Sequence, residues 1–341
     1  MELVLYDESD GYYSSPERRT VGRKGDFYTS VSVGEMFGFL LSQQIQKCRE
    51  EFFEPKQPFS IVEQGAHDGQ LALDILSGLR EDGEDSVRYR IVDPRPATRE
   101  WLSRRFEEAG FGEQVKIVAT LEEASAEQGI FLCNELLDAF PFHRLRLGES
   151  GWEELQVGCE KGHLCFTGRP LSEGMQKYAV RIGDNLPLGY TTEVCPLAES
   201  WLKEAAGLFE RGFWWIIDYG HEAPDYFSPH RSDGTFRCYR DHRASEDPFD
   251  HLGETDITAH VNFTFLENAA EECGLKWRKL TDQHHFLIGA ARDWLLSIEG
   301  QTSAGQDPGS AKRLRQFQTL THPGMMGTQF KVAVLSKGIS S

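Results

Sequence analysis

The sequence lacks a long apolar run, a cysteine framework and a recognisable targeting segment. No stretch of about 18 consecutive apolar residues occurs, so no membrane-spanning helix is predicted. The seven cysteines include no Cys-x-x-Cys pair, which argues against a disulfide framework and a zinc site. Residues 1–7 lack the basic start and apolar core of a signal peptide and are too acidic for a transit peptide. We therefore expect a cytoplasmic protein.

Positive charge is also scarce. Lys and Arg number 36 against 54 Asp and Glu, which gives a net charge of −18. Nucleic-acid binding needs clustered Lys and Arg, so the balance argues against a phosphate-backbone partner. A basic protein or peptide substrate is compatible with it, although solubility alone also explains the charge. Histidines are abundant in residues 221–260, but none has metal-ligand spacing on a predicted helix, so we expect no metal site.

Apolar runs and amphipathic segments alternate from Phe59 onward. Strands are predicted at 60–63, 88–92, 115–118, 130–133, 214–217 and 330–335, and helices at 33–47, 69–79, 96–109 and 196–211. Such alternation implies right-handed crossovers and a parallel sheet with helices on both faces. The predicted class is α/β, a doubly wound Rossmann-like sheet.

Several segments stand outside this alternation. We expect residues 1–58 to form an N-terminal cover of helix and loop, and residues 59–341 to form the α/β core. Within the core, 144–194 reads as a β-rich insertion with a hairpin turning at Lys161-Gly162. Residues 221–259 have few apolar side chains and predict a functional lid or a disordered loop. Residues 300–310 have the composition of an exposed linker.

The turn after the first core strand has the form Gly-x-Gly-x-Gly with its middle glycine replaced: it reads Glu63-Gln64-Gly65-Ala66-His67-Asp68-Gly69. A strand, a glycine turn and a helix present backbone N–H groups to a nucleotide-type cofactor. Gly65 and Gly69 allow close approach, and Glu63 can accept from an ammonium group. A strand–helix turn without a ligand is the alternative. If position 67 requires a positive φ, histidine costs roughly 1 kcal/mol or more there.

Asp93 ends the next predicted strand, 24 positions after Gly69. An acidic residue at this place binds the ribose hydroxyls of a dinucleotide or an adenosyl cofactor. The turn and Asp93 together predict a nucleoside-containing cofactor, and they do not separate NAD from S-adenosylmethionine.

Further polar residues follow two later strands. Asn134, Glu135 and Asp138 come after the fourth strand, and Asp218 after the fifth. The carboxyl ends of parallel strands meet at one edge, so convergent carboxylates there predict a site for a cationic group. The alternative is that Asn134 or Asp138 caps a helix.

Segments spread over nearly the whole chain resemble the MidA family of S-adenosylmethionine-dependent methyltransferases, which includes a mitochondrial assembly factor of respiratory complex I. The matching segments are 5–7 with 11–13, 25–30 with 36–38, Glu63-x-Gly65 with Gly69, 134–139, 217–220, 234–242, 256–263 and 326–332. The resemblance implies a seven-stranded sheet whose last strand is antiparallel. The family's Gly-Pro-Gly turn here reads Gly65-Ala66-His67, and its Ser-Pro reads Ser30-Val31.

The resemblance also implies the cofactor and its contacts. S-adenosylmethionine would be bound by Gly25, Asp26, Phe27, Thr29, Ser30, Glu63, Gly65, His67, Gly69, Asp93 and Asn134. Mitochondrial members of the family look like protein-arginine methyltransferases, so we expect methyl transfer to a nitrogen by direct displacement. Glu135, Asp138 and Asp218 would position a guanidinium and take its proton, and His260 is a further candidate proton acceptor. A catalytically weak scaffold, a small-molecule methyltransferase and, more distantly, an NAD-dependent oxidoreductase are the alternatives.

Overall fold

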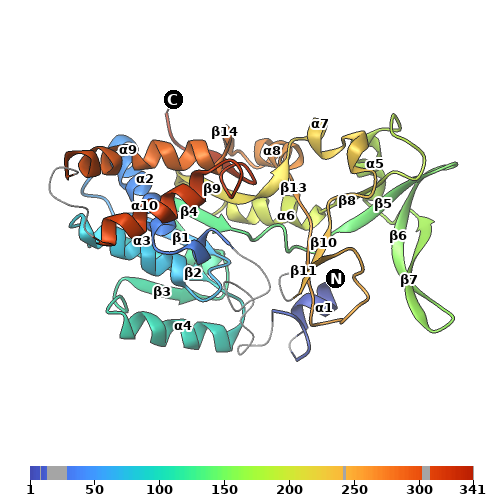
Figure 1. The fold of residues 1–341 in the computed structure, drawn as a ribbon, viewed down its shortest axis with the longest axis horizontal. Coiled ribbons are helices and arrows are strands. Elements are labelled where there is room, and N and C mark those ends of the chain that lie inside the picture. Colours follow the sequence, from blue (N-terminus) through green and yellow to red (C-terminus); the bar gives the residue numbers. More distant parts are fainter. Residues whose placement is uncertain (8, 14–28, 241–242, 302–307, 341) are drawn as a thin grey trace. The chain divides into compact units, whose positions relative to one another are not determined.

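The computed structural model describes residues 1–7, 9–13, 29–240, 243–301 and 308–340 (Figure 1). The chain forms two compact units. The core unit comprises Tyr28–Leu136, Leu202–Tyr219 and Ala269–Ser341, and the insertion unit comprises Met1–Phe27, Leu137–Trp201 and Gly220–Asn268. Within the described ranges, no helix has the length and apolar character needed to cross a membrane.

A mainly parallel sheet forms the centre of the core unit. Its strands are β1 (Ser60–Gln64), β2 (Arg88–Val92), β3 (Val115–Val118), β4 (Ala126–Asn134), β9 (Phe209–His221), β14 (Lys276–Asp282) and β15 (Phe330–Lys337), in the order β14-β15-β9-β4-β1-β2-β3. The first five run parallel, and β15 lies antiparallel to both β9 and β14. The predicted α/β class and the antiparallel last strand are confirmed, whereas β14 was not predicted.

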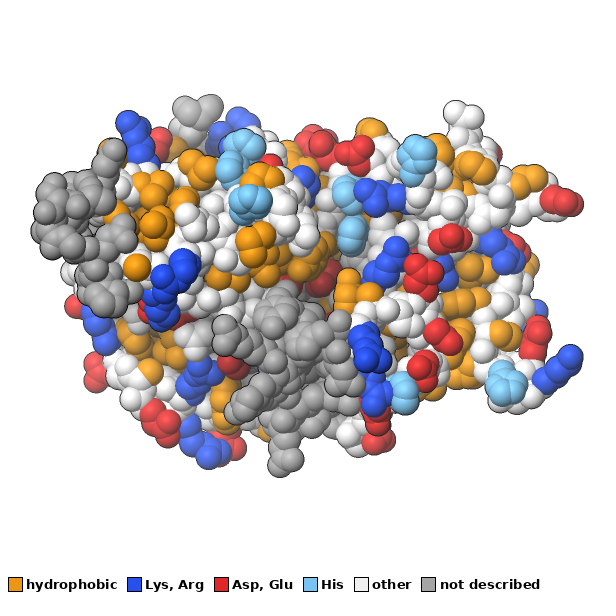
Figure 2. Space-filling model, in the orientation of Figure 1, with side chains coloured by type: hydrophobic (Ala, Val, Ile, Leu, Met, Phe, Trp, Pro, Cys, Tyr) orange, Lys and Arg blue, Asp and Glu red, His pale blue; other side chains and the backbone are white. Residues whose placement is uncertain are grey.

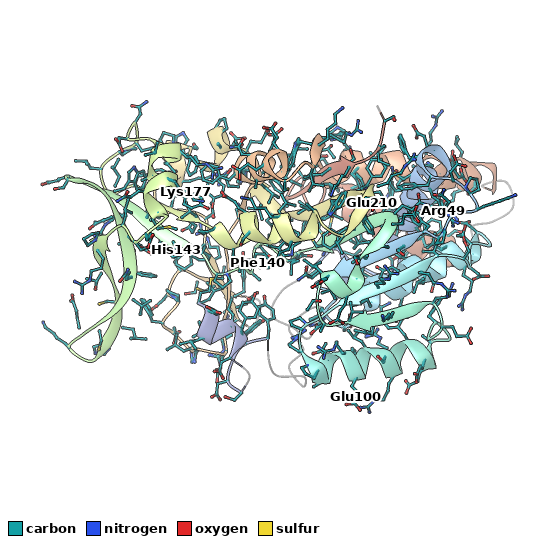
Figure 3. All side chains as sticks on the ribbon, turned by 180° about the vertical axis from the view of Figure 1, so that it is seen from behind. Arg49, Glu100, Phe140, His143, Lys177 and Glu210 are labelled. Carbon is teal, nitrogen blue, oxygen red and sulfur yellow. The ribbon has the colours of Figure 1, made fainter. Side chains whose placement is uncertain are left out.

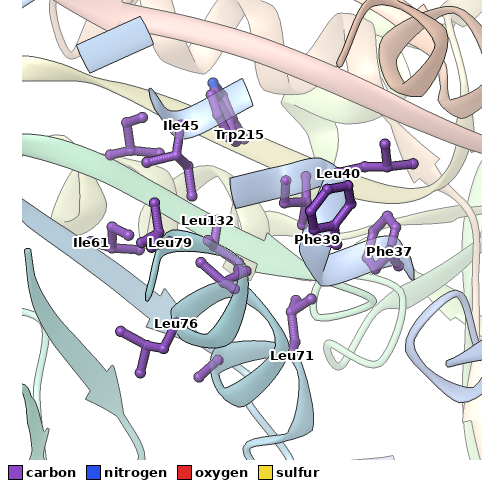
Figure 4. Close-up of a cluster of buried hydrophobic side chains, with 14 of the residues drawn as sticks. Phe37, Phe39, Leu40, Ile45, Ile61, Leu71, Leu76, Leu79, Leu132 and Trp215 are labelled. Carbon is purple, nitrogen blue, oxygen red and sulfur yellow. The ribbon is translucent and has the colours of Figure 1, made fainter. Parts of the chain in front are cut away.

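Helices cover this sheet because alternate strand side chains point to opposite faces. The helices are α2 (Met36–Phe52), α3 (Gln70–Glu81), α4 (Pro96–Glu108), α6 (Pro196–Ala205), α9 (Gln283–Gln301) and α10 (Pro308–Thr321). Figure 4 shows α2 and α3 side chains meeting Ile61, Leu132 and Trp215 of the sheet in one core cluster. Trp214 points to the other face, where its indole N–H donates to the Ala205 carbonyl at 2.9 Å.

The helix predicted over 196–211 is too long. It ends at Ala205, and Phe209 already begins β9. The reason is the burial of Leu208 and Phe209, which pairs this segment with the start of β4. The predicted linker 300–310 falls largely outside the described residues, between α9 and α10.

The insertion unit contains a four-stranded antiparallel sheet. Its strands are β5 (His143–Gly148), β6 (Gly151–Glu160), β7 (His163–Pro170) and β8 (Thr191–Val194), in the order β7-β6-β5-β8, and α5 (Met175–Ile182) precedes β8. The long β6–β7 hairpin is visible in Figure 1. It turns at Lys161 and Gly162, both with positive φ (52° and 84°), so the predicted hairpin is confirmed.

The segment predicted as a lid or loop is folded. It holds α7 (Ala223–Tyr226) and a sheet of β10 (Arg237–Arg240), β11 (Arg243–Ser245) and β12 (Asp256–Thr258) in the order β11-β10-β12, followed by β13 (Val261–Asn262) and α8 (Phe263–Glu272). Much of its apolar partner surface comes from the N-terminal residues, since Leu5 of α1 (Glu2–Tyr6) and Tyr12, which follows this helix, pack with Phe236, Cys238 and Ile257. Short 3-10 helices lie at Val31–Val33, Glu122–Ala124 and Pro229–Arg231.

Candidate cofactor and acceptor sites

The carboxyl ends of β1, β2 and β4 lie in register with Ile217 of β9, a strand that continues to His221. Gln64 at the end of β1 pairs with Val92 of β2 and with Cys133 of β4, and Asn134 pairs with Ile217 of β9. Gly65, Asp93, Glu135 and Asp218 are the residues that follow these pairs. The sheet therefore collects the predicted polar residues of the core unit along one edge, the usual ligand side of a parallel sheet.

The glycine turn occupies the left-handed region at three positions. Gly65, His67 and Gly69 have φ values of 83°, 48° and 73°. A Cβ on Gly65 would lie 3.2 Å from Leu136, and one on Gly69 would lie 3.0 Å from Leu102 and Phe106. Both glycines therefore allow close packing of the turn. His67 has a positive φ, a conformation that costs an L-residue roughly 1 kcal/mol. The backbone strain expected from the sequence for a positive φ at this position is therefore present.

Arg105 of α4 holds the turn from one side. Its guanidinium donates to the Asp68 backbone carbonyl and, at 2.7 Å, to the Gln70 side-chain oxygen, and it lies 3.2 Å from the Asp68 carboxylate. The Asp68 carboxylate also accepts the Gln70 N–H at the start of α3. Burial alone would raise the pKa of Asp68, but His67 and Arg105 lower it to about 2. The contacts of Arg105 therefore hold the charged Asp68 next to His67, the residue with the strained backbone.

Glu63 is a buried carboxylate at the end of β1, with 2% of its surface exposed. Tyr89 of β2 donates its hydroxyl to Glu63 Oε2 at 2.7 Å. Burial raises the pKa of Glu63 to about 7, and the tyrosine hydrogen bond opposes that rise. A buried carboxylate of this kind is costly unless a cation or donors compensate it, which suits a ligand ammonium group. Sequence reasoning missed Tyr89, although its two-residue offset from Ile91, the partner of Glu63, places it on the same face.

Asp93 is engaged by its own loop. Arg95 binds both carboxylate oxygens, with Nη2 2.6 Å from Oδ2 and Nε 3.0 Å from Oδ1, while the Arg95 N–H donates to Oδ1 at 2.8 Å. Ribose hydroxyls binding at Asp93 would share or replace these bonds. The Arg95 contact was also missed, and the Asp-x-Arg spacing was its only sequence signal.

Asn134 and Asp218 lie on the neighbouring strands β4 and β9 of the core unit, and Glu135 directly follows β4. The Asn134 amide donates to Glu135 Oε1 at 2.9 Å, and the Glu135 N–H donates to the Ile217 carbonyl at 2.9 Å. Glu135 has a φ of 52°, a strained backbone typical of functional sites. Asp218 is fully buried and accepts the N–H of Tyr219. Residues 135–142 form turns, so the helix-cap alternative for Asn134 and Asp138 is wrong.

The N-terminal residues implied in cofactor binding divide into two groups. Gly25, Asp26 and Phe27 lie outside the described residues. Thr29 and Ser30 are buried, and the Ser30 hydroxyl donates to the Gln283 side-chain oxygen at 2.8 Å. Gln283 in turn donates to the Leu320 carbonyl. The Ser30 hydroxyl thus has a structural hydrogen bond to the start of α9.

Asp138 and His260 belong to the insertion unit, where they line the same pocket. The Asp138 carbonyl accepts the Ala259 N–H at 2.9 Å, which ties the two segments together. The His260 N–H donates to the Thr235 hydroxyl at 3.1 Å, and its ring lies 5.2 Å from that of His221. Burial, with further lowering by neighbouring positive groups, brings the pKa of His260 to about 4. His260 is therefore neutral at pH 7 and able to accept a proton.

The pocket has a volume of about 30 Å³, room for roughly two water-sized groups. Its apolar walls include Phe140, which is labelled in Figure 3, together with Phe142 and Phe265. Its polar lining comprises Asp138, Glu193, Cys195, Glu199, His260 and Asn262. Two of its carboxylates have cationic partners, since Glu193 pairs with Arg144 and Glu199 with Arg181. No group of three metal-ligand side chains occurs in the part of the chain that is described.

Residues 40–281 match the family described as "Putative S-adenosyl-L-methionine-dependent methyltransferase". The chain belongs to this methyltransferase family. A relative from Drosophila melanogaster, named protein arginine methyltransferase NDUFAF7 homolog, mitochondrial, is 28% identical over 99% of this chain and 80% of its own. Protein arginine methyltransferase NDUFAF7 of Xenopus tropicalis is 26% identical over 97% and 80%.

A solved structure gives the same family. The crystal structure of a COG1565 superfamily member from Burkholderia thailandensis, bound to S-adenosyl-homocysteine, is 30% identical, with a TM-score of 0.86 over all of this chain and 87% of that one. This chain is thus an S-adenosylmethionine-dependent methyltransferase. Its core unit fits the cofactor, because the close-packed glycine turn and the buried Glu63 suit an amino-acid end with an ammonium group.

Proposed function

We propose that this methyltransferase transfers the methyl group to an arginine nitrogen of a protein. The relatives from fly and frog carry this activity in their names. The observation that carries the proposal here is the pocket that Asp138 and a neutral His260 both line. A basic region of the target protein also suits the insertion unit, whose sequence contains 25 Asp and Glu against 14 Lys and Arg.

On the cofactor side, we assign Glu63 to the ammonium group and Asp93 to the ribose hydroxyls. Gly65, His67 and Gly69 would line the amino-acid end, beside the N-terminus of α3. S-adenosylmethionine, when bound, supplies an electrophilic methyl group on a sulfonium. The strained Glu135 and the buried Asp218 would add negative charge at this edge of the sheet, and the neutral Asn134 amide would hold the Glu135 carboxylate in place by its hydrogen bond.

On the acceptor side, Asp138 would orient the guanidinium and stabilise its charge. The guanidinium loses one N–H proton to His260, and the freed nitrogen lone pair forms the new bond to the methyl carbon as the carbon–sulfur bond breaks. The products are a methylated guanidinium and S-adenosylhomocysteine. Burial lowers the pKa of His260 to about 4, so its ring is neutral before the step, and the neutral imidazole is the form that can accept the proton.

Asp138→Asn tests the assignment. We expect methyl transfer to fall by about 100-fold or more, because an amide cannot orient and compensate a guanidinium as a carboxylate does. The measurement is incorporation of label from methyl-labelled S-adenosylmethionine into arginine of fractionated cell protein. Binding of S-adenosylhomocysteine, measured by calorimetry, should be unchanged. Asp184→Asn, which alters an exposed carboxylate of the same unit, is the matched control and should behave as the wild type.

Three results would contradict the proposal. Label found only in the small-molecule fraction would indicate a small-molecule acceptor. Cofactor binding without transfer to any fraction would indicate a scaffold that keeps the fold. Full activity of Asp138→Asn would remove the pocket from the mechanism. The cytoplasmic location stays a prediction, and the relatives named above are mitochondrial proteins.

A further inference from the structure

The contact between Tyr89 and Glu63 has the geometry of a positioning hydrogen bond. The Tyr89 hydroxyl lies 2.7 Å from Glu63 Oε2, and the two side chains are 0% and 2% exposed. Both come from adjacent parallel strands, with Tyr89 two residues before Ile91, the register partner of Glu63. Water therefore has little access to the hydrogen bond between them.

The bond fixes one carboxylate oxygen and leaves the other for a ligand. Among the described residues, Glu63 Oε1 accepts no hydrogen bond, whereas Oε2 has the tyrosine hydroxyl as its donor. A carboxylate can turn about its last torsion when nothing holds it. One fixed oxygen therefore determines the direction in which the second oxygen points.

The hydroxyl also stabilises the charged form of Glu63. Burial is the larger influence and raises the pKa of this carboxyl to about 7, while the bond from Tyr89 lowers it. Without the hydroxyl, the carboxyl would bind a proton more tightly and would be neutral over more of the physiological range. A neutral carboxyl has lost the charge that attracts an ammonium group.

We propose that Tyr89 is a positioning residue for the cofactor: it orients the Glu63 carboxylate and keeps it ionised so that Glu63 binds the α-ammonium group. The proposal rests on the cofactor role of Glu63 given under the proposed function. It assigns Tyr89 no contact with the methyl group or with the acceptor. Its effect is therefore confined to ligands that carry the amino-acid end.

Tyr89→Phe tests this with two ligands that differ in that end. S-adenosylhomocysteine has the ammonium group, and 5′-methylthioadenosine lacks the whole amino-acid portion. We expect the affinity for S-adenosylhomocysteine at pH 7 to fall on the order of ten-fold, since a hydrogen bond to a charged group is lost. The affinity for methylthioadenosine should stay within about two-fold of the wild type. Both are measured by titration calorimetry.

The dependence of S-adenosylhomocysteine affinity on pH distinguishes a positioning role of the Tyr89 hydroxyl from a role in core packing alone. Between about pH 6 and pH 9, the acid limb of S-adenosylhomocysteine binding should move to higher pH in Tyr89→Phe, because Glu63 then keeps its proton longer. In Glu63→Gln the acid limb should disappear, and adding Tyr89→Phe to that variant should change the affinity little. Non-additivity of this kind identifies residues that act through one another.

Tyr190→Phe is the matched control. It removes another buried tyrosine hydroxyl, which donates to the Ser228 carbonyl in the insertion unit, and should leave both affinities unchanged. Equal losses for the two ligands in Tyr89→Phe, or additive losses with Glu63→Gln, would overturn the role of Tyr89 and leave the methyltransferase function standing. If the wild type bound methylthioadenosine but not S-adenosylhomocysteine, both assignments would fail.

Discussion

His67 has a positive φ, a backbone conformation that glycine adopts with less strain than an L-residue does. Its φ of 48° lies between two glycines with positive φ in the same turn. The half-exposed ring lies 3.9 Å from the Asp68 carboxylate, and a surface pair of this kind contributes little to stability. We expect His67→Gly to raise the free energy of unfolding by up to about 1 kcal/mol, measured in denaturant.

The neighbouring substitution Ala66→Gly is the control for His67→Gly. Ala66 is buried and is not among the described residues with positive φ. Glycine there loses a packed methyl group and adds freedom to the unfolded chain, so the protein should lose roughly 1 kcal/mol. The same sign for both variants would show that the φ of residue 67 is not a source of strain.

The sequence predicted which polar residues lie at the ends of the strands. It did not predict the side chains that hydrogen-bond to them. Glu63, Asp93, Asn134, Glu135 and Asp218 could be placed at one edge because parallel strands end together. The bonds that Tyr89 and Arg95 make to two of them depend on rotamers and burial, which a spacing pattern does not specify. The positive φ of Glu135 was likewise unpredictable, since it arises from the turn that leaves β4.

At the scale of elements, α4 stabilises the turn that precedes α3. Arg105 reaches from α4 to Asp68 and Gln70, and its side chain is largely buried. Arg105→Ala should lower the free energy of unfolding by about 2 kcal/mol, because several charge-assisted bonds are lost. The same variant should weaken S-adenosylhomocysteine binding, since the turn lines its amino-acid end. Denaturant unfolding and calorimetry measure the two effects.

The preceding residue supplies the control for Arg105. Arg104 is exposed on α4 and pairs with Glu100 one turn earlier. Such a surface pair contributes about 0.5 kcal/mol or less, so Arg104→Ala should leave cofactor affinity unchanged. Equal behaviour of the two arginine variants would mean that Arg105 does not hold the turn.

Helices and strands that carry a local pattern of apolar residues could be predicted from the sequence. Strands whose apolar side chains pack against residues far away in the sequence could not. The strands β2 and β3 were predicted to the residue because aromatic and β-branched residues alternate with Arg or Lys in both. The sheet of β10, β11 and β12 has short strands with many charges, and its apolar side chains pack with Leu5 and Tyr12 from the other end of the insertion unit's sequence. No local pattern reveals a partner more than 200 residues away.

At the scale of the whole molecule, charged side chains divide between the surface and the interior. On the face shown in Figure 2, acidic and basic side chains are interspersed. Several carboxylates are instead buried, among them Glu63, Asp218 and Glu193. A net charge of −18 therefore includes groups that influence stability through burial as well as groups that influence solubility.

Buried Glu63 makes the stability of the ligand-free protein depend on pH. Burial raises its pKa from 4.5 to about 7, so the folded state favours the protonated carboxyl. That contribution is fully present below about pH 4.5 and is lost as the pH rises through 7. His260 acts in the opposite direction, because its lowered pKa removes stability as the pH falls from 6.5 toward 4.

Glu63→Gln isolates the first of these two contributions. Glutamine cannot ionise, so the stability of the variant relative to the wild type should increase by on the order of 3 kcal/mol between about pH 4.5 and pH 8. His260 is present in both proteins, and its contribution cancels in the difference. The measurement is denaturant unfolding of ligand-free protein across this range. A difference that stays constant with pH would mean that Glu63 is ionised as easily in the folded protein as in the unfolded chain, and the electrostatic basis for its role with Tyr89 would be lost.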